Sequence, residues 1–287
     1  MNKIGIFFAY WVRDWASDVD VYIKSIERAA GLGFNAIELF AAPLYDMSKS
    51  DMDKLRDAQE KYDMKLIYSY CFTADNDVSA KDAVIRKRGI DFMKQVIKNI
   101  GYVSGPTAIG GITNSSWHGV IEDSKQAHWE RAVESVKEII KETEEKGITY
   151  LLETVNRFET YMLNTHQESL QFAKDVDHPN IKIHLDTFHM NIDEDDMETA
   201  IINTGNMIGH FHVGENNRRP PGTGNLDWDM VFASLKKVDY QGPIVMEPFV
   251  LSGGTVAGDI ALYRELMPGA DLDVEAKKAL DFVRGKL

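Results

Sequence analysis

Three acidic side chains and one imidazole recur at a regular interval in the second half of the chain. Glu153, Asp186, His212 and Glu247 are separated by 33, 26 and 35 residues, and each closes a short apolar run. Three carboxylates and one imidazole suit a divalent cation such as Mn²⁺, Co²⁺ or Mg²⁺. Without a cation, neighbouring carboxylates on a partly buried rim would repel one another. The four residues are therefore predicted to bind one divalent metal ion.

The elements that must position these groups alternate between two patterns. Brief runs rich in β-branched and aromatic residues predict buried parallel strands, and the longer amphipathic runs between them predict helices. The expected strands cover residues 4–10, 35–40, 65–70, 106–111, 148–154, 180–186, 207–213 and 243–249. The expected helices cover residues 19–33, 51–63, 83–101, 128–147, 166–177, 193–205, 227–238 and 274–287.

Eight strands and eight helices in alternation are typical of a (β/α)8 TIM barrel, an α/β fold of about 250 residues. We expect one such domain over residues 1–287, since no linker or change in composition divides the chain. A doubly wound open sheet is the alternative, but it usually carries a glycine-rich turn after its first strand. Here that strand runs into AYWVRDW, residues 9–15, which contains no glycine.

The barrel explains the regular spacing of the four candidate ligands. Active residues of such barrels lie at the C-terminal ends of the strands, and one βα unit takes about 31 residues. The four groups are thus expected side by side on one rim. His184 and His210 share strand parity with Asp186 and His212, so we expect them inside the barrel one layer lower, as packed core residues. Glu38, at the end of the second strand, is expected either to contact the site or to cap the next helix.

Composition limits the class of protein further. The chain has 44% hydrophobic residues and a formal net charge of −13, which disfavours nucleic acid as a partner. The single cysteine, Cys71, allows neither an intramolecular disulfide nor a cysteine-rich zinc site, which fits a cytoplasmic location. The first apolar run is too short for a signal peptide or a membrane span, so no membrane partner is expected.

Six segments also carry a resemblance to a known family. ETVNRFE (153–159), LDTFHMNIDED (185–195), GHFHVGENNRRPPG (209–222) and VMEPFVLSGGT (245–255) resemble the ketose 3-epimerases, the group of D-tagatose and D-psicose 3-epimerases. The N-terminal MNKIGIFFAYW and the later YRELMPGAD are similar to that group as well. The resemblance extends over essentially the whole chain.

The resemblance implies a metal-dependent barrel that inverts carbon 3 of a free ketose, as between D-tagatose and D-sorbose or D-fructose and D-psicose. It implies that Glu153, Asp186, His212 and Glu247 bind the metal, and that Glu153 and Glu247 are also the acid/base pair. It further implies a homodimer or homotetramer. The sugar is then held by Glu159, His189 and Arg218, and walled by Phe7, Trp15, Trp117 and Phe249.

The implied chemistry agrees with these residue types. A proton on carbon 3 is acidified by the neighbouring carbonyl, and its removal gives a cis-enediolate. Inversion then requires a proton on the opposite face, which two carboxylates from different strands can supply. A cation would stabilise the developing charge.

Two stretches depart from the family pattern. Tyr68 to Cys71 replace residues that are usually small, and the residue after Trp117 is not proline. We expect both stretches to face carbons 4 to 6 of the sugar, with Tyr68 or Tyr70 narrowing the pocket. The preferred ketose therefore stays open, including a modified keto-sugar.

Three other functions remain as alternatives. An aldose–ketose isomerase would use the same metal and enediolate. A DNA-cleaving barrel of the endonuclease IV type would need further histidines and a less acidic surface. A sugar-binding protein without catalysis would not need an acid/base pair. Phosphate binding by SGGT, residues 252–255, is not expected, because the resembling family acts on free sugars.

Overall fold

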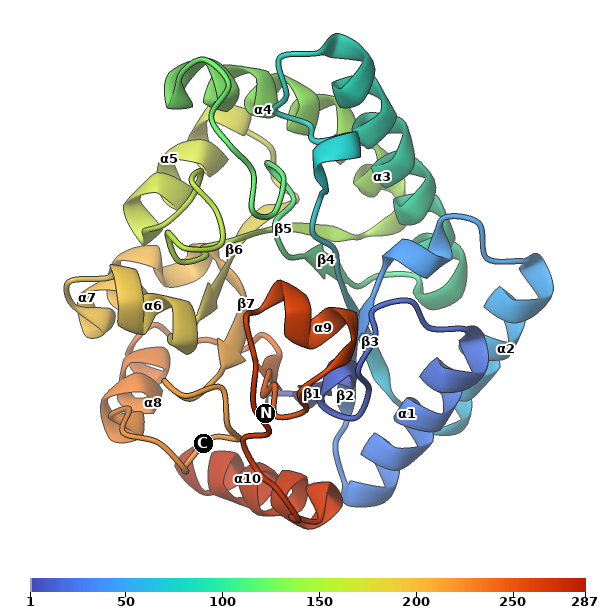
Figure 1. Ribbon diagram of the computed structural model, residues 1–287, viewed down its shortest axis with the longest axis vertical. Helices are drawn as coiled ribbons and strands as arrows, with labels where there is room; N and C mark the ends of the chain where they lie inside the picture. The colour runs from blue at the N-terminus through green and yellow to red at the C-terminus, as the bar shows by residue number, and fades with distance from the viewer. Residues whose placement is uncertain (1) are drawn as a thin grey trace.

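The computed structural model describes residues 2–287 and contains a closed barrel of eight parallel strands. Each strand pairs with its sequence neighbours, and β1 also pairs with β8 (Figure 1). This confirms the predicted TIM barrel. The strands are β1 (Ile4–Phe7), β2 (Ala36–Phe40), β3 (Lys65–Ser69), β4 (Ala108–Gly110), β5 (Thr149–Glu153), β6 (Ile181–Asp186), β7 (Ile208–Val213) and β8 (Ile244–Met246).

Helices surround the barrel, as Figure 1 shows, and most of them begin at a polar side chain that caps the first turn. Asp18, Ser48, Ser124 and Thr165, for example, each accept a hydrogen bond from a backbone amide of the following turn. The helices are α1 (Val19–Leu32), α2 (Lys49–Lys61), α3 (Ala83–Ser104), α4 (Lys125–Ile139), α5 (His166–Val176), α6 (Thr187–Asp193), α7 (Met197–Thr204), α8 (Trp228–Lys237), α9 (Gly254–Asp259) and α10 (Leu272–Lys286).

Two short helices differ from the sequence prediction. One helix was predicted over residues 193–205, but α6 already begins at Thr187 and ends at Asp193, and a separate helix, α7, follows its capping residue Asp196. The other helix that was not predicted is α9, which follows β8 and lies over the barrel in the view of Figure 1. Both α6 and α9 lie at the end of the barrel where the candidate residues gather.

Strand β8 is shorter than predicted. The expected strand covered residues 243–249, but the ladder ends at Met246. Pro248 has no backbone N–H to donate, so the pairing cannot continue through it. Beyond it, the amide of Phe249 donates to the carbonyl of Arg218 at 2.9 Å. Glu247 therefore stands just beyond the strand, free of the β-ladder.

One continuous core of apolar side chains fills the barrel and the layer between strands and helices. The buried polar residues include Glu38, His184, His210 and His212, which lie on the barrel strands. As predicted, His184 and His210 are buried in the interior. Among residues 2–287, no helix is long and apolar enough to cross a membrane.

Candidate active site

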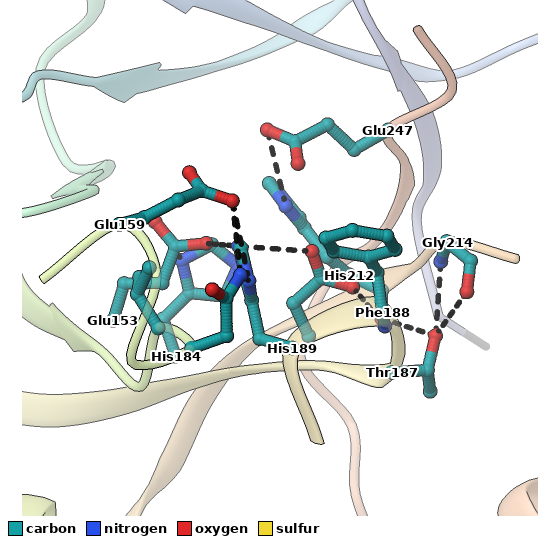
Figure 2. A network of polar contacts seen from close by, with 12 residues as sticks. Glu153, Glu159, His184, Thr187, Phe188, His189, His212, Gly214 and Glu247 are labelled. Carbon is teal, nitrogen blue, oxygen red and sulfur yellow. Dashed lines mark hydrogen bonds and ion pairs between the residues drawn. The ribbon is translucent and has the colours of Figure 1, made fainter. Parts of the chain in front are cut away.

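Asp186 lies at the junction of β6 and α6 and has two roles in the fold. Its Oδ1 atom accepts a hydrogen bond from the amide of Phe188 at 2.9 Å and so caps α6. Its Oδ2 atom is buried and has no hydrogen-bond partner. Thr187 ties this turn to β7, because its hydroxyl lies 2.8 Å from the carbonyl oxygen of Gly214 (Figure 2). One carboxylate oxygen of Asp186 thus caps α6, and the other is free to bind a ligand.

The four predicted metal ligands meet in space. Glu153, Asp186, His212 and Glu247 each offer one ligand atom, and these atoms lie within 4.8 Å of one another. Nδ1 of His212 lies 3.6 Å from Oε1 of Glu247 and, like Oδ2 of Asp186, lacks a hydrogen-bond partner. Buried polar atoms without partners are uncommon in native proteins. A divalent cation would satisfy both atoms, so the donor set fits the predicted metal ion.

The electrostatics of the cluster agree with that fit. Burial raises the pKa of Asp186 to about 7, and the charge of Glu247 adds to this effect. Burial and the same neighbour raise the pKa of Glu153 well above its usual value. Burial opposes protonation of His212, but the charges of Glu38 and Glu247 outweigh it and raise the pKa of the imidazole. Crowded carboxylates therefore retain protons that a cation would displace.

His189 projects from α6 toward this cluster. Its Nε2 atom lies 3.7 Å from Oδ2 of Asp186 and 3.8 Å from Oε1 of Glu153. Burial and the charge of Arg218 lower the pKa of His189 well below its usual value, so the ring is neutral at pH 7. Asn156 supports its Nδ1 atom from the other side, with Nδ2 at 2.7 Å. We therefore assign the ring proton to Nε2, facing the pocket.

Arg218 connects the carboxylates that line the pocket. Its guanidinium lies 3.1 Å from Oε2 of Glu247 and 3.3 Å from Oε1 of Glu159. It also lies over the ring of Phe188, 3.6 Å from the ring centroid. The backbone of Arg218 adopts a φ of 62°, an uncommon conformation for a residue with a side chain. Such local strain is typical of functional loops, where surrounding contacts maintain it.

Aromatic side chains form the opposite wall of the pocket. Trp15 contacts Phe7, Trp117 and Phe249, with ring centroids 5.9 to 6.1 Å apart. The indole N–H of Trp117 donates to Oε2 of Glu159 at 3.1 Å. The aromatic wall and the facing carboxylates enclose one pocket. Its lining contains Phe7, Trp15, Trp117, Glu153, Glu159, His189, Arg218, Glu247 and Phe249.

The structure therefore brings every candidate residue from the sequence into one region. Asp186 and His212 lie beneath the pocket, and the other nine line it. Sequence analysis left the role of Glu38 open between a helix cap and a site contact. Its Oε2 atom lies 2.8 Å from Nε2 of His212, so it contacts a candidate ligand from below.

Comparison with known proteins identifies the family that the sequence motifs resemble. Residues 26–281 match the family described as the xylose isomerase-like TIM barrel. The chain is 41% identical to a D-psicose 3-epimerase of Ruminiclostridium cellulolyticum, covering 98% of this chain and 97% of that one. It is 37% identical to a D-psicose 3-epimerase of Agrobacterium fabrum, covering 98% of each. The chain belongs to the ketose 3-epimerase family.

Solved structures agree with this membership. The crystal structure of a D-psicose 3-epimerase with D-tagatose, from Clostridium cellulolyticum H10, superposes with a TM-score of 0.95. The two chains are 40% identical, and the match covers 99% of each. The barrel described above is thus the family fold, and the protein is an enzyme of the isomerase class.

One prediction about departures from the family is wrong. We expected Tyr68 or Tyr70 to narrow the pocket, but Ser69 and Cys71 line it instead. Side chains alternate along β3, so Tyr68 points away from Ser69, and Tyr70, just beyond the strand, packs against Phe92 of α3 with ring centroids 4.8 Å apart. The hydroxyl of Tyr68 lies 2.7 Å from Ser104, and that of Tyr70 accepts from Asn76 at the same distance.

Proposed function

We propose that this protein epimerises a free ketose at carbon 3, with a divalent metal ion bound by Glu153, Asp186, His212 and Glu247. One arrangement carries the proposal: Glu153, at the end of β5, and Glu247, just beyond β8, reach into the same pocket and form one cluster with Asp186 and His212. When bound, the metal ion would act as a Lewis acid that stabilises negative charge on the sugar oxygens.

The two glutamates supply the proton transfers. Glu153, on β5, and Glu247, just beyond β8, approach the pocket from different sides of the barrel. One takes the proton from carbon 3, giving a cis-enediolate, and the other delivers a proton to the opposite face. The direction of the reaction decides which of them begins.

Three polar residues are proposed to orient the sugar. Arg218 and Glu159 are paired at 3.3 Å and face the pocket together, so they suit neighbouring hydroxyl groups. The Nε2–H of His189 is placed to donate to a substrate oxygen. The aromatic wall excludes water and contacts the C–H faces of the sugar. These roles place the reacting carbon between the two glutamates.

The substrate is proposed to be an unphosphorylated ketose such as D-fructose, D-psicose or D-tagatose. Arg218 is the one arginine or lysine among the residues that line the pocket, and its guanidinium is already paired with Glu247 and Glu159. A sugar phosphate would require further cationic or backbone donors. The acidic net charge of −13 also disfavours a phosphorylated substrate.

The test removes metal with EDTA, restores Mn²⁺ or Co²⁺, and incubates the protein with D-tagatose and D-fructose separately in D₂O. NMR should show metal-dependent deuterium at carbon 3 and accumulation of the 3-epimer. Deuterium at carbon 1 or 2 with an aldose product would replace the proposal with an aldose–ketose isomerase. Metal binding without exchange in any free ketose would overturn the proposed substrate class.

We further propose a homodimer or homotetramer in the cytoplasm. The resemblance to the ketose 3-epimerases supports this assembly, and Val120, Phe158 and Tyr263 are largely exposed apolar side chains. Light scattering during gel filtration should give a mass of two or four chains of 32.5 kDa. A monomer at micromolar concentration would contradict this proposal.

A further inference from the structure

Glu38 forms a contact across the barrel that the proposed reaction does not use. The residue lies on β2 and is fully buried. Its Oε2 atom accepts hydrogen bonds from Nε2 of His210 at 2.7 Å and from Nε2 of His212 at 2.8 Å. Both histidines lie on β7, and β1 and β8 separate that strand from β2. A side chain from one wall of the barrel thus contacts two residues of the other.

This contact determines which nitrogen of His212 faces the metal site. An imidazole ligand binds a cation through the lone pair of one nitrogen, and a carboxylate on the other nitrogen fixes the ring and increases its basicity. Glu38 occupies Nε2, so the unpartnered Nδ1 atom is left for the cluster, 3.6 Å from Oε1 of Glu247. His212 is therefore arranged as an Nδ1 ligand.

The surrounding side chains hold Glu38 in this position. A buried carboxylate is costly unless it is paired, and here two imidazoles share one of its oxygens. His184 packs against both, with ring centroids 4.5 Å from His210 and 4.0 Å from His212. The two hydrogen bonds from β7 thus hold the carboxylate of Glu38 in place.

We propose that Glu38 is a positioning residue of the metal centre, which fixes the ring of His212 so that Nδ1 presents its lone pair to the cation. His210 supports this role by anchoring the same carboxylate oxygen. The proposal rests on the proposed metal-dependent function. It adds a residue outside the four ligands whose loss weakens metal binding although it does not touch the metal.

The first experiment measures metal affinity in the full-length protein. Apoprotein is titrated with Co²⁺ in competition with a chelator. E38Q keeps the shape of the side chain but removes its charge, and we expect a dissociation constant about 10- to 100-fold higher, the usual cost of losing such a partner. E38D keeps the charge on a shorter side chain and should lose less affinity.

A matched control comes from Glu194, the residue that follows α6, and His166, the first residue of α5. Glu194 is a buried carboxylate that accepts a hydrogen bond from Nδ1 of His166 at 2.8 Å, so it forms the same kind of pair outside the metal cluster. E194Q should retain the wild-type affinity for Co²⁺. Equal affinities in wild type, E38Q and E38D would overturn the positioning role. If E38Q does not fold, the Co²⁺ affinity of E38D is compared with that of wild type. Equal affinities would again overturn the positioning role.

A double-mutant cycle separates positioning from a general effect on the barrel. If Glu38 acts through His212, E38Q should have little further effect on Co²⁺ affinity once H212A has removed the imidazole. The visible absorption spectrum of bound Co²⁺ should also change in E38Q. Additive losses in the cycle would overturn the proposal while leaving the metal site intact. No Co²⁺ binding by wild type would overturn both this proposal and the proposed function.

Discussion

The side-chain amide of Asn156 lies 2.7 Å from Nδ1 of His189. The same Nδ2 atom lies 2.9 Å from Oε1 of Glu159, and Oδ1 of Asn156 accepts from the amide of Phe158. All three contacts agree on which end of the amide carries its hydrogens. Asn156 therefore orients two pocket residues at once and leaves the Nε2–H of His189 for the substrate.

Replacing Asn156 with aspartate should impair the reaction. The new carboxylate can only accept, so it would pull the ring proton of His189 to Nδ1 and repel Glu159. Because a hydrogen bond contributes about 1 kcal/mol and an unmatched buried group costs about 1–3 kcal/mol, we expect kcat/KM for D-psicose to fall by roughly 10- to 100-fold. Steady-state kinetics measure this loss.

The control for that variant is Asn203, whose amide lies 3.4 Å from Nε2 of His166 away from the pocket. Asn203→Asp should keep kcat/KM close to the wild-type value. If Asn156→Asp were equally active, the tautomer assigned to His189 would be wrong. A ¹⁵N NMR spectrum of the ring nitrogens then shows directly which one carries the proton.

Glu153→Gln and Glu247→Gln should each abolish turnover without unfolding the protein. Loss of a positioned acid or base typically costs a factor of about 10²–10⁴. Each variant also removes one of three crowded carboxylates, so the metal-free protein should unfold at an equal or higher temperature at pH 8. Epimerisation rates and calorimetry of the apoprotein test the two parts separately.

The same Glu-to-Gln change at Glu194 provides the reference, because that carboxylate is buried beside His166 rather than in the cluster. It should preserve turnover. Near-normal activity in Glu153→Gln or in Glu247→Gln would exclude the two-carboxylate mechanism, whichever of the two variants shows it.

Stabilisation by metal should increase with pH between about 5.5 and 8. Burial raises the pKa of Asp186 to about 7 from an ordinary value of 3.8, and it raises that of Glu153 in the same direction. The folded apoprotein thus binds more protons than the unfolded chain in this interval, and the stability from these groups is lost as the pH rises. A bound cation replaces those protons, so the stabilisation of the folded protein by metal increases as the pH rises.

Calorimetry with and without Mn²⁺ across this pH range tests the prediction. His184 and His189 titrate in the opposite sense, because burial lowers the pKa of both, but they affect the two forms alike. In Asp186→Asn, the stability of the apoprotein should decline less with pH than in wild type. A metal-induced shift in Tm that stayed constant from pH 5.5 to 8 would contradict the raised carboxyl pKa values.

The barrel and most of the site could be predicted because the spacing of the strands along the chain shows which side chains reach the same rim. Metal-competent side chains that each close an apolar run, about one βα unit apart, must meet on one rim of a closed barrel. Glu153, Asp186, His212 and Glu247 do meet there. The partner of His212 could not be chosen in the same way, because from the sequence alone Glu38 was equally compatible with a cap for the next helix. Only the closed barrel shows that Glu38 reaches β7.

The error at β3 has a different physical origin. The prediction that Tyr68 or Tyr70 narrows the pocket relied on the size of these side chains. The register of the strand decides instead which side chains face the pocket. Phe40 pairs with Ser69, and both line the pocket, so the alternating tyrosines must point outward. The register of neighbouring parallel strands is not visible in one sequence, although parity within the strand would have separated the two tyrosines from Ser69 and Cys71.

Substrate preference should therefore respond to Cys71 rather than to Tyr70. The thiol lies in the pocket wall, and we expect it to face carbons 4 to 6 of the sugar. Cys71→Leu adds bulk there, so kcat/KM should fall about 10-fold or more for D-fructose and D-psicose and less for a five-carbon ketose. The matched change outside the pocket is Tyr68→Phe, which removes the contact with Ser104 and should lower stability by about 1 kcal/mol while leaving the ratio of substrates unchanged. A ratio altered by Tyr68→Phe but not by Cys71→Leu would show that the outward face of β3, not the pocket wall, controls the choice of ketose.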